Sequence, residues 1–131
     1  MADLFSNQWM KRFQNEWNSE SGLAKDLAQA KFSSNIAYGF KNEEQPRGVL
    51  VVSKGKVTLA GEFDGEELNW DLRADPDDWI YWLKNPPGLM GLGMAYTSKK
   101  LKFKAGDYAS MIKDPSIASP FIKSFMVMAR V

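Results

Sequence analysis

Strict alternation of apolar and polar residues marks two short segments of the chain. Residues 67–74 carry Leu68, Trp70, Leu72 and Ala74 on one side and Glu67, Asn69, Asp71 and Arg73 on the other. Residues 100–104 repeat the pattern, with Leu101 and Phe103 placed between three lysines. Because the side chains of a strand point alternately to its two faces, both segments are predicted to be strands with one apolar and one polar face.

Three further strands are predicted upstream of these two. In residues 35–40 the large residues Ile36, Tyr38 and Phe40 alternate with a polar or small residue. Residues 49–52 form a continuous aliphatic run that is typical of a strand covered on both faces. A Lys-Gly pair at residues 54–55 separates this run from residues 57–61. These two segments are therefore predicted to form a hairpin.

Helical periodicity dominates the N-terminal part of the chain. In residues 5–17 an aromatic residue recurs at every fourth position, namely Phe5, Trp9, Phe13 and Trp17. Polar residues fill the opposite side, which predicts an amphipathic helix of about three to four turns. Leu23, Leu27 and Ala30 predict a second helix.

Aspartate and proline mark where the later helices begin. Asp75 is predicted to cap a helix whose first residue is Pro76, and residues 79–83 of that helix are apolar on nearly every side. Residues 89–96 are apolar and rich in methionine, and their two internal glycines predict a locally soft segment. A Ser-Pro pair predicts that the last helix begins at Pro120.

Together these elements predict an α+β fold, in which helices pack on a five-stranded, mostly antiparallel sheet. The strand at residues 100–104 leads through Gly106 into a short helix that Asp107 is predicted to cap. Because this strand comes late in the chain, we expect it to enter the sheet through a crossover. The length of 131 residues fits one domain over residues 1–131.

Cysteine and histidine are both absent from the sequence. Their absence excludes a disulfide, a thiolate nucleophile and the commonest general base, so we expect no catalytic site, no metal site and no cofactor. No apolar run approaches the roughly 18 residues that span a bilayer, and no targeting signal precedes the first helix. We therefore expect a soluble, cytoplasmic protein.

Charge is distributed unevenly along the chain, although its net value is +1. Residues 1–96 hold 10 basic and 14 acidic side chains, a net charge of −4, whereas residues 97–131 hold 7 and 2, a net charge of +5. Such polarity can orient a protein at an anionic surface, and one interpretation is a transient contact with an anionic membrane. The alternative is that these charges are only the solvated faces of a strand and some helices, since lysines on an exposed strand face also guard against edge pairing. No arginine cluster accompanies them, and we expect no nucleic-acid partner.

The second half of the chain is rich in apolar residues, among them methionines, which adapt to ligands of variable shape. We interpret these residues as the lining of a hydrophobic tunnel for a lipid or acyl-chain ligand. The alternative is that they only fill the core. An anionic headgroup would need a basic partner, for which Lys99, Lys100 and Lys113 are weak candidates. The predicted lining residues are Trp70, Leu72, Trp79, Ile80, Trp82, Leu83, Leu89, Met90, Leu92, Met94, Phe103, Phe121, Phe125, Met126 and Met128.

The sequence A-Y-T-S-K-K-L-K-F-K-A-G-D at residues 95–107 resembles the signature of the sterol carrier protein type 2 domain. In that signature an aromatic residue, a short turn, a Lys-Leu pair and a basic-apolar alternation lead to a glycine and the next helix. Two positions depart from the pattern, because Lys99 stands where the family usually has glycine and Ala105 is an extra residue before Gly106. The order of the other elements also matches, and the resemblance covers roughly residues 5–128.

This resemblance implies a sheet flanked by helices around a tunnel that binds fatty acids, acyl-CoA, sterols or phospholipids without catalysis, with residues 121–128 at its border. The first hypothesis is accordingly a lipid carrier, monomeric or weakly dimeric, that transfers its ligand or presents it to an enzyme. The second is an interaction module or small subunit whose apolar helices dimerise or dock on a partner enzyme. The third is an enzyme, but Asp75, Asp77 and Asp78 are explained by their place at a helix start.

Overall fold

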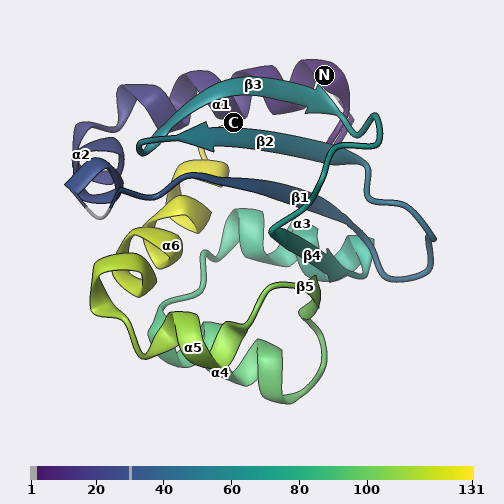
Figure 1. The fold of residues 1–131 in the computed structure, drawn as a ribbon. Helices are drawn as coiled ribbons and strands as arrows, with labels where there is room; N and C mark the ends of the chain where they lie inside the picture. Colours follow the sequence, from purple (N-terminus) through teal and green to yellow (C-terminus); the bar gives the residue numbers. More distant parts are fainter. Residues whose placement is uncertain (1–2, 30) are drawn as a thin grey trace.

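A five-stranded sheet with helices on one face is the architecture of residues 3–29 and 31–131, the part of the chain that this computed structural model describes (Figure 1). The helices are α1 (Asn7–Ser19), α2 (Ser21–Gln29), α3 (Pro76–Lys84), α4 (Leu89–Thr97), α5 (Tyr108–Ile112) and α6 (Pro115–Met128). The strands are β1 (Ser34–Phe40), β2 (Gly48–Ser53), β3 (Lys56–Glu62), β4 (Trp70–Ala74) and β5 (Lys102–Ala105). The predicted α+β class is confirmed.

The strand order in the sheet is β3-β2-β1-β4-β5. β2 pairs antiparallel with both β1 and β3, and β5 pairs antiparallel with β4, so the mostly antiparallel prediction is confirmed. β4 pairs parallel with β1, and the chain therefore crosses over between β3 and β4. The expectation that the crossover precedes the last strand is wrong. β5 returns beside β4 after α3 and α4 have reversed the chain direction, which makes it an antiparallel neighbour.

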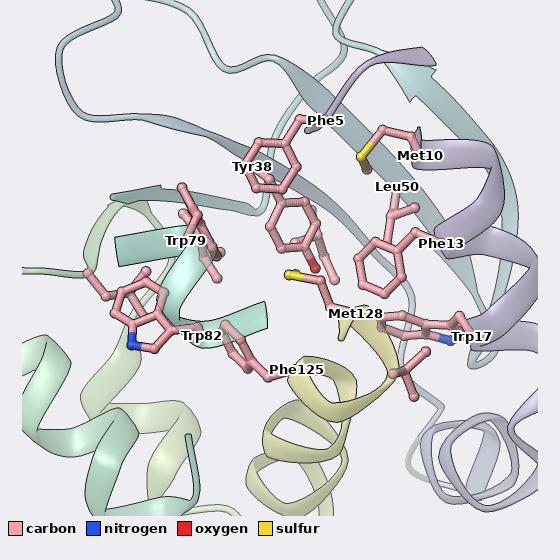
Figure 2. Close-up of a cluster of buried hydrophobic side chains, with 14 of the residues drawn as sticks. Phe5, Met10, Phe13, Trp17, Tyr38, Leu50, Trp79, Trp82, Phe125 and Met128 are labelled. Atoms are coloured by element: carbon pink, nitrogen blue, oxygen red, sulfur yellow. The ribbon is translucent and has the colours of Figure 1, made fainter. Parts of the chain in front are cut away.

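The core lies between the inner face of the sheet and helices α1, α3 and α6, and aromatic side chains fill much of it (Figure 2). The ring centroids of Phe5 and Trp79 are 5.0 Å apart. The indole of Trp17 donates a hydrogen bond to the Gly55 carbonyl at 2.9 Å, and that of Trp79 donates to the Gly39 carbonyl at 2.8 Å. A buried N–H donor without a partner lowers the stability of the fold by about 1–3 kcal/mol. Because each indole N–H has a partner on the sheet, the two tryptophans can be buried at no such cost and they anchor α1 and α3 to the sheet.

The predicted helix starts are only partly reproduced. Asp75 occupies the N-cap of α3 and Pro76 its first position, as predicted, but the Asp75 carboxylate makes no capping hydrogen bond and lies 3.7 Å from Lys41 Nζ. Residues 89–97 form the helix α4 in spite of their two glycines. Ala30, which the sequence assigns to the second helix, lies outside the described residues.

The last helix begins at Pro115, so the prediction of a start at Pro120 is wrong. Asp114 is the N-cap, and its carboxylate accepts hydrogen bonds from the backbone N–H of Ser116 at 3.1 Å and from the Ser116 hydroxyl at 2.6 Å. Proline at a first helical position sacrifices no helical hydrogen bond. Pro120 does remove one inside the helix, but its ring is buried against the core, which offsets that loss.

The polar side of β4 is buried, which the alternating pattern does not predict. Asp71 and Arg73 are 6 % and 1 % exposed. Arg73 Nε lies 2.6 Å from Oδ1 of Asp71, and Arg73 Nη2 lies 3.0 Å from Oδ2. The same guanidinium donates to the backbone carbonyls of Glu43 at 2.7 Å and Glu44 at 3.3 Å. One arginine therefore holds the loop between β1 and β2 over the outer face of the sheet.

Replacing Arg73 by methionine is expected to lower the free energy of unfolding by about 3–5 kcal/mol, because the Asp71 carboxylate would stay buried without its partner. The matched control is Arg130→Met. Arg130 is 48 % exposed, and its ion pairs with Glu16 and Glu20 contribute roughly 0–1 kcal/mol. Urea unfolding of both variants measures the difference, and equal losses would contradict the role assigned to the buried pair.

Candidate functional site

Helices α1, α2, α5 and α6 close an apolar cavity against the inner face of β1 and β4. Its volume is about 10 Å³, roughly the room that one water molecule needs. Ile36 and Trp70 are direct neighbours in the parallel β1–β4 register, so the sheet supplies one wall. The lining residues are Trp17, Leu27, Phe32, Ile36, Trp70, Met111, Ile117 and Phe121.

A surface depression lies next to the cavity, and Trp70, Met111 and Ile117 line both. The depression is open to solvent and has a polar rim, whose side chains are Asn69, Asp107, Ser110 and Asp114. Apolar walls inside and polar groups at the opening are the arrangement expected for a site that takes an amphipathic small molecule.

The charged side chains of the rim are carboxylates. Asp107 caps α5 by accepting hydrogen bonds from the Ser110 hydroxyl at 2.7 Å and the Ser110 backbone N–H at 3.2 Å. These bonds hold the pKa of Asp107 below its usual range, and the charge of Lys113 adds a smaller effect. Lys113 does not line the depression, and Lys100 lines a separate groove between α3 and α4. An anionic headgroup at the rim would therefore meet the carboxylates of Asp107 and Asp114, whereas the nearby Lys113 lies outside the lining of the depression.

Aromatic side chains connect the cavity to α4, α5 and β5. The ring centroid of Trp70 lies 6.0 Å from that of Phe103 and 6.4 Å from that of Phe121. Phe103 lies 5.9 Å from Tyr96. Tyr96 in turn stacks on Tyr108 with 4.1 Å between the ring centroids. A chain of aromatic contacts thus connects Trp70 in the cavity wall to Tyr96 on helix α4.

The two departures from the family signature both have a structural explanation. Lys99, which replaces the usual glycine, has a φ of +66°, in the left-handed region that glycine adopts without strain. The extra residue forms a β-bulge, because Asp71 pairs with Ala105 whereas its neighbour Leu72 pairs with Phe103. The local backbone of this chain therefore accommodates both departures.

The predicted lining residues fall into three environments. Trp70 and Phe121 line the cavity. Leu83 and Phe103 are partly buried at the edge of the core. The fully buried members pack in the core: Leu72, Trp79, Trp82, Leu92, Phe125 and Met128. The solvent-exposed members are Ile80, Leu89, Met90, Met94 and Met126. A direct ligand contact stays a prediction for all of these residues, and of the fifteen only Trp70 and Phe121 line the cavity.

Six cavity residues were missed by the sequence prediction. Trp17 and Leu27 lie on helix faces that their periodicity correctly marks as apolar. What the periodicity does not predict is the place in the fold where these two faces come together. That place depends on the crossover that brings β1 beside β4. The short α5 and the early start of α6 bring in two further side chains. The six residues are Trp17, Leu27, Phe32, Ile36, Met111 and Ile117.

Acidic side chains within residues 3–29 and 31–131 do not gather into groups that could hold a metal ion. Asp75, Asp77 and Asp78 lie at the start of α3, where the sequence predicts them to be. In the same part of the chain, no helix has both the length and the hydrophobicity that crossing a bilayer requires.

The arrangement of the sheet and helices defines the class of fold, which is that of the sterol carrier protein type 2 domain. A crystal structure of sterol carrier protein 2 matches with a TM-score of 0.77 and 20% sequence identity, over 98% of this chain and 99% of that one. A solution structure from Thermus thermophilus, of a conserved hypothetical protein described as a possible sterol carrier protein, matches with a TM-score of 0.67 and 17% identity, over 98% and 86%.

A third similar structure is UbiJ-SCP2, a ubiquinone synthesis protein, with a TM-score of 0.61 and 11% identity over 93% of this chain and 88% of that one. No protein-family model and no curated protein matches the sequence. The resemblance seen in residues 95–107 is thus confirmed as an SCP2-like fold.

Gly106 keeps Trp70 in the wall of the cavity. Its φ is +98°, and a Cβ at this position would overlap the indole ring. Gly65 is a matched control, since its φ is +86° but a Cβ there would meet no atom within 4 Å. We expect Gly65→Ala to lower the free energy of unfolding by about 1–2 kcal/mol, and Gly106→Ala to lower it by roughly a further 1–3 kcal/mol. Urea unfolding measures both, and equal losses would show that Gly106 does not position Trp70.

Proposed function

We propose that this protein binds a lipid in the apolar cavity and carries or presents it without catalysing a reaction. The observation that carries the proposal is the cavity itself, whose lining side chains are all hydrophobic and which lies beside a depression with a polar rim. The fold that it shares with sterol carrier protein 2 supports this reading. The proposal includes one domain over residues 1–131 and a cytoplasmic location, as expected from the sequence.

The cavity must enlarge to hold a lipid, because small-molecule pockets typically measure about 300–1,000 Å³ and this cavity measures about 10 Å³. The strands of its wall are fixed by hydrogen bonds to their neighbours. The opposite wall is easier to displace, since α5 has five residues and Met111 has a flexible side chain. We therefore place the entry between α5, the first turns of α6 and β4.

Burial of the lipid chain supplies the driving force for this opening, at about 0.8 kcal/mol for each CH₂ group removed from water. The polar end of the lipid would remain at the rim beside Asp107 and Asp114. Two carboxylates disfavour a fatty-acid carboxylate or a phosphate there through like-charge repulsion. Among the lipid classes expected from the sequence, a sterol-like or otherwise uncharged headgroup fits this rim best.

Ile117→Trp is expected to fill the cavity and to weaken the binding of a fluorescent fatty alcohol by about tenfold or more, which corresponds to roughly 1.4 kcal/mol. Ile117 lines both the cavity and the depression, so a larger side chain there blocks the path of the lipid. Met126→Trp is the control, because Met126 lies on the same helix and is 57 % exposed. Weaker binding in the Met126 variant alone would place the site on the exposed residues predicted from the sequence.

Native mass spectrometry of the purified protein, with analysis of its organic extract, tests the proposal without a chosen ligand. A stoichiometric additional mass that is identified as a lipid is the expected result. Absence of both a bound lipid and measurable uptake of fluorescent lipids would overturn the proposal. A bare dimer would favour the alternative of an interaction module.

A further inference from the structure

Helix α4 exposes an apolar surface to solvent, although the outer face of a surface helix is normally polar. Leu89, Met90 and Met94 are 57 %, 82 % and 71 % exposed, and Tyr96 is 40 % exposed. We call these four residues the α4 face. The helix contains no charged residue, and its opposite side, with Leu92, is buried in the core. The fold therefore holds α4 in place with its apolar residues directed outward.

Lysines border the α4 face. Between residues 79 and 106 the sequence has five lysines and no aspartate or glutamate. Lys99 and Lys100 follow the C-cap of α4, Ser98, and are exposed. Lys100 and Met94 line the same open groove between α3 and α4. Exposed apolar residues and positive charge thus occupy one continuous part of the surface.

A lipid bilayer fits this combination better than a protein surface does. Lysine is depleted at protein interfaces, whereas at a membrane its stem lies along apolar groups and its ammonium reaches the headgroups. Tyrosine is enriched at the boundary between lipid and water, and Tyr81 and Tyr96 are both exposed here. A second copy docked through the same face would bring two lysine borders together, and like charges would oppose that contact.

We propose that the α4 face docks on the surface of an anionic phospholipid bilayer. α4 would lie in the plane of the interface, with Met90 and Met94 below the headgroups and Lys99 and Lys100 among them. Tyr96 stacks on Tyr108 of α5, and α4 and α5 lie side by side (Figure 1). A docked bilayer would thus lie near the helix that closes the cavity. Docking does not require the cavity to bind lipid, so the two proposals are tested separately.

Flotation of the whole protein with phosphatidylcholine vesicles, with and without phosphatidylserine, measures this docking. We expect binding to the vesicles that contain phosphatidylserine and a decrease as salt is added, because salt screens the lysines. Lys99→Gln together with Lys100→Gln is expected to weaken binding roughly fivefold for each lysine. Met90→Ser together with Met94→Ser is expected to weaken it by about tenfold or more. Both methionines are exposed, so the melting temperature should be unchanged.

Matched controls lie at the opposite end of the molecule, where β3 forms the other edge of the sheet (Figure 1). Leu59→Ser removes an apolar side chain that is 52 % exposed, and Lys54→Gln with Lys56→Gln removes two exposed lysines. These variants should bind as the unaltered protein does. Failure to bind phosphatidylserine vesicles, or equal binding by all variants, would overturn the proposal. A dimer that Met90→Ser with Met94→Ser dissociates would instead assign the face to a second copy.

Discussion

The parallel pairing of β4 with β1 is the constraint on which the rest of the structure depends. It places Trp70 beside Ile36, and a slip of one residue would turn every apolar side chain of β4 away from the helices. Polar contacts fix the register at both ends. The backbone N–H of Asn35 donates to the Asn69 side chain at 2.8 Å, and that of Asn69 donates to the Asn35 carbonyl at 3.0 Å. At the other end Arg73 clamps the loop between β1 and β2.

Because the register is fixed, the sheet wall of the cavity is stiffer than its helical wall. The sheet wall is held by backbone hydrogen bonds, and the absence of a side chain at Gly106 leaves room for the Trp70 indole in that wall. The helical wall depends on side-chain packing and on the caps that Asp107 and Asp114 provide. Local opening free energies are lowest where short elements are held by few buried contacts. Enlargement of the cavity should therefore proceed by movement of α5 and α6, while the sheet wall with Trp70 keeps its shape.

Features that depend on neighbours within a few residues are predictable from this sequence. The four-residue aromatic period of α1 and the Asp-Pro start of α3 are examples. The cavity is different, because Met111 and Ile117 reach it only through the crossover and through an Asp114 cap that prevails over the signal at Pro120. The α4 face could not be predicted from the sequence either. α4 is apolar on every side, so its sequence has no periodicity that distinguishes exposed Met90 from buried Leu92.

The two proposed lipid contacts, the cavity rim and the α4 face, carry charges of opposite sign. The rim of the cavity carries Asp107 and Asp114, whereas the α4 face is bordered by Lys99 and Lys100. Under the two proposals, an anionic phospholipid would be attracted by the lysines of the α4 face and repelled by the carboxylates of the rim. Salt screens both effects over a short distance, so that each site would act on the lipid nearest to it. A protein docked on an anionic membrane would then keep its cavity for an uncharged lipid, even though charged lipids surround it. Lysines at the rim would remove that distinction, since the bulk lipid of the membrane would compete for the same opening.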